Sequence, residues 1–139
     1  MSETSRHHRS VRVPAAQAAA VHEALVTTYA VKADALAVAA GGDAPAVVQD
    51  ARRELAEAED ALDAVGWQVA PGEGFELAGA AGLVREVLYG ALLAVAEAVG
   101  ERCREYEAGR AGRDELARAV GDVVVVHELF DRLEALDAL

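Results

Sequence analysis

Residues 43–66 carry the clearest periodic pattern in the chain. Apolar side chains recur there at alternating spacings of three and four, which is the repeat of one face of an α-helix. Most of the intervening positions are arginine, glutamate or aspartate. The apolar positions are Val48, Ala51, Leu55, Ala58, Leu62 and Val65. The pattern predicts a helix with one buried stripe and one solvated face, capped by Asp43 and ended by Gly66.

Three other segments, residues 14–40, 77–107 and 113–139, are also predicted to be helices. Pro14 suits the first turn of a helix, and Gly41 with Gly42 suits a helix end. Alanine, the best helix former, supplies 33 of the 139 residues. The valine run at 123–126 favours a strand by propensity, but it lies inside a helical pattern and no partner strand is evident. The sequence therefore predicts an all-α fold.

Short connections make consecutive helices antiparallel neighbours, so we expect an up-down-up-down four-helix bundle. Residues 14–139 would form this single domain. Residues 1–13 carry a local positive charge and are predicted to be a flexible basic arm. In the alternative interpretation, this arm lies on an acidic surface of its own chain or of a partner.

The first and fourth helices have more apolar surface than one seam uses. On the first, Val31 and Val38 lie opposite the face that contains Leu25. On the fourth, Leu129, Leu133 and Leu136 lie beside the main stripe. Four helices offer no further layer to cover this surface. We therefore expect a homodimer through helices 1 and 4. The alternative is that alanine-rich faces tolerate water.

His22 and His127 are the candidate ligand residues, because antiparallel first and fourth helices would bring them to similar heights. Asp131 follows His127 by four residues and could join them. A metal site needs three or four convergent ligands, so structural roles for the two histidines are favoured over a metal or small-molecule site. No cofactor is expected.

Trp67 and Phe75 lie in the long connection 67–76. Aromatic side chains in such a loop usually fold back to close one end of a bundle. The functional alternative is a small apolar pocket or a partner-binding surface at that end.

Several function classes are disfavoured. The net charge of −11 opposes nucleic-acid binding, and the longest apolar stretch of the third helix is too short to span a membrane. Cys103 is the only cysteine, so no intrachain disulfide is possible, and we expect a cytoplasmic protein. Catalytic motifs are not found, so an enzyme is not expected.

Lys32 is the only lysine beside many arginines, and with the abundant alanine this is typical of bacteria with GC-rich genomes. The expected function is a non-catalytic protein-interaction or structural module that self-associates. The alternative is a small-molecule or metal-binding bundle that uses His22 and His127.

Overall fold

The computed structural model describes residues 8–68 and 73–137, and this part of the chain is mostly helical, as predicted. It also contains a two-stranded antiparallel sheet. The elements are β1 (His8–Val13), α2 (Ala15–Ala40), α3 (Pro45–Val65), β2 (Phe75–Ala80), α4 (Ala81–Glu107) and α5 (Arg113–Asp137).

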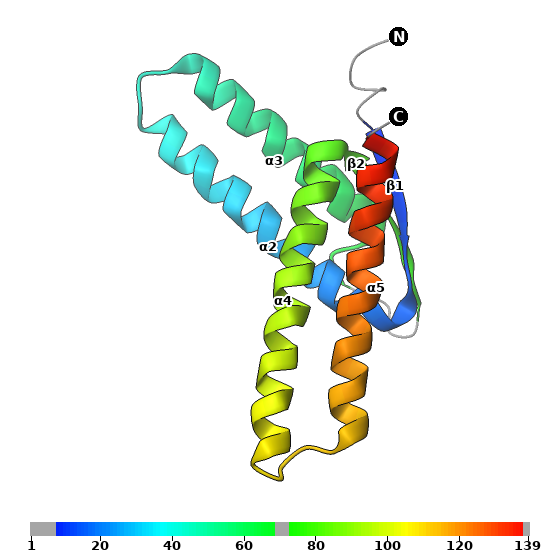
Figure 1. Ribbon diagram of the computed structural model, residues 1–139. Coiled ribbons are helices and arrows are strands. Elements are labelled where there is room, and N and C mark those ends of the chain that lie inside the picture. Colours follow the sequence, from blue (N-terminus) through cyan, green and yellow to red (C-terminus); the bar gives the residue numbers. More distant parts are fainter. Residues whose placement is uncertain (1–7, 69–72, 138–139) are drawn as a thin grey trace.

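The helices form two antiparallel hairpins, α2–α3 and α4–α5, which point in different directions (Figure 1). They meet where α2 packs against α4, whereas α3 and α4 have little direct contact despite being consecutive helices. This arrangement differs from the expected up-down-up-down bundle. The reason is that the connection between α3 and α4 is not a plain loop, because it contains strand β2.

The two strands make a ribbon in which Val11 lies opposite Leu77 and Val13 lies opposite Phe75. Val11, Val13 and Leu77 are buried, while Arg12 and Glu76 between them are exposed. This alternation is the signature of a half-buried strand. The ribbon forms because it buries one apolar face on the helices, and it packs chiefly against α3 and α4 through β2.

The ribbon changes two expectations from the sequence. Residues 8–13 form a strand with a buried face where a flexible arm was expected, and residues 1–7 lie outside the described residues. The ribbon also supplies a further layer, which covers apolar surface that was expected to need a second copy. Leu129 and Leu133 of α5 belong to the same apolar core as Val11 and Val13, so they are not available to a second copy.

The valine run 123–126 lies within α5, as the helical pattern predicted. Val126 is fully buried, whereas Val124 is half exposed. The core at this level is completed by Leu88 and Val95 of α4. The pattern of burial along α5 therefore follows the helical repeat and not the alternation of a strand.

We predict that Val13→Ala lowers the free energy of unfolding by about 1–3 kcal/mol, because it removes buried methyl groups and leaves a cavity. The matched control is Val124→Ala, at a half-exposed position of α5. It should change stability by no more than about 0.5 kcal/mol, because alanine is a good helix former. Urea denaturation followed by circular dichroism measures both. Equal, small effects would mean that β1 is not part of the core.

Candidate functional site

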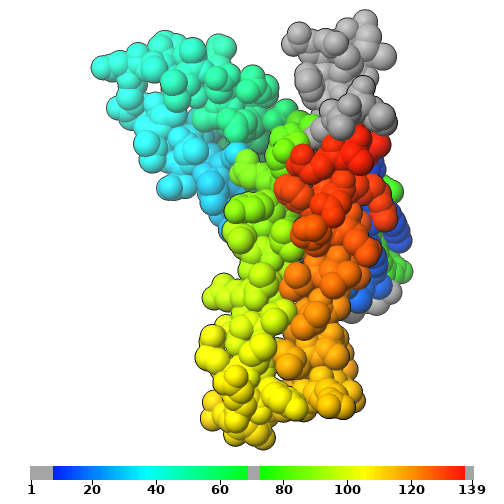
Figure 2. All heavy atoms as spheres, in the orientation of Figure 1, coloured from blue at the N-terminus to red at the C-terminus, as the bar shows by residue number. Residues whose placement is uncertain are grey.

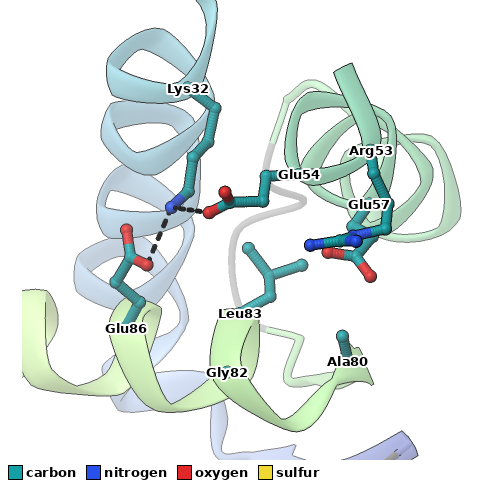
Figure 3. A pocket seen from close by; sticks show the side chains of 8 residues that line it. All are labelled: Lys32, Arg53, Glu54, Glu57, Ala80, Gly82, Leu83 and Glu86. Atoms are coloured by element: carbon teal, nitrogen blue, oxygen red, sulfur yellow. Dashed lines mark hydrogen bonds and ion pairs between the residues drawn. The ribbon is translucent and has the colours of Figure 1, made fainter. Parts of the chain in front are cut away.

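Lys32 of α2 lies where three helices meet, and its ammonium group binds two carboxylates (Figure 3). Nζ is 2.9 Å from Oε1 of Glu54 on α3 and 2.9 Å from Oε1 of Glu86 on α4. The Lys32 side chain is only 14% exposed, against 43% for Glu54 and 46% for Glu86. Lys32 is the only lysine of the sequence, and its ammonium group is thus largely buried between two carboxylates.

The surroundings of Lys32 act on its pKa in opposite directions. Burial lowers the pKa, because the charged form loses water. Hydrogen bonds and charge attraction from Glu54 and Glu86 raise it, and together they outweigh the burial, so the pKa lies above the usual 10.5. Lys32 is therefore a fixed positive charge at neutral pH and not a nucleophilic amine.

A cavity of about 230 Å³ adjoins this ion pair, between α3 and the start of α4 (Figure 3). Its lining combines two cationic side chains, three carboxylates and a small apolar floor. The lining residues are Lys32, Arg53, Glu54, Glu57, Ala80, Gly82, Leu83 and Glu86. With charges of both signs already paired or close together, the cavity presents no strong preference for an anion or a cation.

His22 is buried on α2, and its Nε2 atom lies 2.9 Å from the carbonyl oxygen of Gly66. Gly66 ends α3 in a backbone conformation with φ of 103°, which glycine adopts readily. In this contact the imidazole N–H donates to a carbonyl group that the helix itself leaves without a partner. His22 therefore joins α2 to the end of α3.

His127 lies exposed on α5, and its Nδ1 atom is 3.1 Å from Oδ2 of Asp131. The two histidines thus have separate partners. Among residues 8–68 and 73–137, no three His, Cys, Asp or Glu side chains are grouped so that they could hold a metal ion. The expected proximity of His22 and His127 assumed that α2 lies along α5, but α2 packs mainly on α3 and α4.

Trp67 follows α3 and packs edge-on against Tyr29 of α2, with 5.1 Å between ring centroids and 88° between ring planes. Its Nε1 atom donates a hydrogen bond to Asp63 at 3.0 Å. Phe75 begins β2 and packs against the core. The two aromatic side chains thus belong to different contacts, one within the α2–α3 hairpin and one under the ribbon.

A second, more apolar groove runs between α2 and α4 and has a volume of about 470 Å³. Small side chains line most of it, with two carboxylates at its border. The lining residues are Ala20, Glu23, Ala24, Thr27, Thr28, Gly90, Ala94, Val95, Ala98 and Asp122. Sequence reasoning did not find this groove, since it depends on which helix lies against α2.

The Lys32 ion pair was also missed from the sequence. The only feature of the sequence that points to this ion pair is the single lysine, which lies in an alanine-rich stretch of helix. The partners Glu54 and Glu86 are 22 and 54 residues away along the chain, so no local pattern connects them.

No protein-family model matches the chain, and neither a curated protein nor a solved structure matches it. Among the described helices, none is long and apolar enough to cross a membrane.

The raised pKa of Lys32 predicts the pH dependence of stability. Since the folded pKa exceeds the unfolded value, the stabilisation is complete below the unfolded pKa of about 10.5 and is lost as pH rises through the folded pKa. Protein labelled with ¹³C at lysine Cε gives one lysine resonance, whose titration should have its midpoint above 10.5. In Glu54→Ala and Glu86→Ala the midpoint should fall. A folded-state midpoint at or below that of the urea-unfolded chain would contradict the buried ion pair.

The two histidines offer a matched pair of substitutions. We predict that His22→Leu costs about 1–3 kcal/mol of unfolding free energy, because the Gly66 carbonyl group loses its donor. His127→Leu, at an exposed position, should change stability by about 0.5 kcal/mol or less. Chemical denaturation at pH 7.5 gives both values. If the two variants lose the same stability, His22 does not have the structural role described.

Proposed function

We propose that this chain is a non-catalytic protein-interaction module that forms a homodimer through the outer face of α2. The observation that carries the proposal is the unused apolar surface of this helix. Val31 is 55% exposed and Val38 is 73% exposed. They share a helix face with Ala20, Ala24 and Thr27, and we call these five residues the outer stripe.

The groove between α2 and α4 supports a helix as the binding partner. Ala20, Ala24 and Thr27 of the outer stripe line this groove, and Val31 and Val38 continue the stripe beyond it. Gly90, Ala94 and Ala98 of α4 form its far wall, and such small residues allow close approach of another helix backbone. From Ala20 to Val38 the stripe is about 27 Å long at the rise of an α-helix, roughly five turns. A second copy of α2 would present the same row of alanine and valine in a self-complementary contact.

The sequence placed the dimer contact on both terminal helices of the expected bundle. The α5 part of that argument used Leu129, Leu133 and Leu136. Leu129 and Leu133 are buried in the chain's own core, whereas Leu136 is exposed. On α5, Val120 and Val124 are exposed as well as Leu136. We therefore centre the proposed contact on α2, and α5 becomes the alternative surface to be tested.

The charge of the chain sets a condition on self-association. Each copy carries a net charge of −11, so two copies repel one another at low ionic strength. The outer stripe itself contains no charged side chain, although Glu23 and Asp34 lie nearby on α2. Salt screens the repulsion and leaves the apolar contact, so dimerisation should strengthen as salt increases.

We also propose that the protein is bacterial and cytoplasmic. Cys103 is half-buried and forms no disulfide in the structure, which suits a reducing cytoplasm. The excess of arginine over a single lysine supports a bacterial source.

Analytical ultracentrifugation at micromolar concentration tests the dimer, in low salt and again in about 0.5 M salt. The expected mass is that of two chains, with a larger dimer fraction in high salt. Val31→Glu should shift the protein to the monomer, because it places a charge in the apolar contact. Val124→Glu, at a similarly exposed position on α5, should leave the dimer intact.

Other outcomes reject the proposal in distinct ways. A wild-type mass equal to one chain in both buffers rules out self-association at these concentrations. Dissociation by Val124→Glu and not by Val31→Glu places the contact on α5. Circular dichroism of each variant confirms that the change in mass does not come from unfolding.

A further inference from the structure

The outer part of the α2–α3 hairpin, residues 33–53, projects away from the rest of the chain (Figure 2). We call it the arm. Ala51 is the only residue of the arm that is fully buried. Leu36, Ala39 and Val48 are half-buried in the seam between the two helices. The arm is thus supported by a thin seam of its own and not by the core beneath the ribbon.

Lys32 lies at the base of the arm, where α2 leaves α4. Its two ion pairs have different structural roles. The contact with Glu54 stays within the hairpin, because both residues belong to α2 and α3. The contact with Glu86 joins the hairpin to α4. α3 has little direct contact with α4 and packs against β2 instead. Among the described residues, the hydrogen bond of Lys32 with Glu86 therefore joins the base of the arm to α4.

The space around this link is open. The cavity of about 230 Å³ lies on the α4 side of the ion pair, and a second one of about 350 Å³ lies between α2 and α3. Both are lined by Lys32 and Glu54. The second also has Val31, Ala35, Ala39, Val47, Asp50 and Ala51 in its lining. A change in the direction of the arm could therefore be taken up by these cavities without displacing packed core side chains.

We propose that the contact between Lys32 and Glu86 is a strap that sets the direction of the arm relative to α4. Since α2 is one continuous helix from Ala15 to Ala40, the arm bends more freely beyond Lys32 when the strap is broken, and the cavity beside Glu86 changes shape. The contact between Lys32 and Glu54 keeps the hairpin itself together during this movement. Because Val38 is on the arm and Ala24 is beside the groove, the strap also fixes the shape of the outer stripe.

The structure provides a matched pair of variants that separates the two contacts. Glu86→Ala removes the link from the hairpin to α4 and leaves Lys32 paired with Glu54. Glu54→Ala removes the link within the hairpin and leaves Lys32 paired with Glu86. The two glutamates are almost equally exposed, so neither substitution creates a buried cavity. Lys32→Arg keeps the charge and serves as the conservative variant.

The measurement is a distance distribution by pulsed electron paramagnetic resonance. Spin labels are attached at Ala40→Cys on the arm and Ala117→Cys on α5, two exposed positions, in the full chain with Cys103→Ser. The labelled protein is diluted with an excess of unlabelled protein of the same variant, which removes distances between copies. The strap does not depend on self-association, and the ultracentrifugation of the same samples reports that property separately.

In the protein that keeps Lys32, Glu54 and Glu86, we expect one narrow distribution of the distance between the two labels. In Glu86→Ala we expect this distribution to be roughly twice as wide, or shifted. Glu54→Ala should keep the narrow distribution, and Lys32→Arg should keep it too. An unchanged distribution in Glu86→Ala overturns the proposal. Equal broadening in Glu54→Ala and Glu86→Ala also overturns it, since the effect would then come from loss of charge pairing in general. Circular dichroism verifies that each variant is folded.

Discussion

The apolar face of the β1–β2 ribbon joins two helical hairpins into one core. Val11, Val13 and Leu77 are shared between the ribbon and the helices, and they lie in the same cluster as Leu62 of α3 and Leu133 of α5. The helices alone also meet where α2 packs against α4, and the ribbon adds its buried apolar face to this contact. The burial of the ribbon therefore explains why the hairpins can point in different directions and still belong to one fold.

Side-chain hydrogen bonds and ion pairs also join the helices to one another. His22 ties α2 to the end of α3, Gln17 of α2 donates to Asp122 of α5, and Lys32 ties α2 to both α3 and α4. Lys32 and Glu54 line two cavities, one on the α4 side of the ion pair and one between α2 and α3. The carboxylates of Glu54 and Glu86 are partly exposed, so these ion pairs contribute only modestly to stability. We therefore propose a role for the Lys32 contacts in the direction of the arm and not in overall stability.

The surface, and not a cluster of chemical groups, carries the functional proposal. The two histidines that the sequence suggested as ligands have other partners in the structure. His22 contacts the carbonyl group of Gly66, and His127 contacts Asp131. By contrast, α2 exposes Val31 and Val38, and Ala20, Ala24 and Thr27 on the same helix face line a groove together with small residues of α4. Exposed apolar side chains next to a groove are typical of contacts between proteins. Lys32 and the proposed dimer surface both lie on α2, so the position of this helix affects the arm and the dimer contact alike.

The sequence by itself determined the helices. Their periodic apolar positions, the alanine content and the glycine-containing ends are local properties, so residues within one turn of each other are sufficient to predict them. Only the tertiary structure decided the ribbon, because each strand is six residues long and gains its stability from pairing with a segment far away in the chain. The partners of Lys32, the separation of His22 from His127 and the burial of Leu129 also followed from which helix packs on which. That choice depends on the summed burial of many small side chains, and no local pattern encodes it.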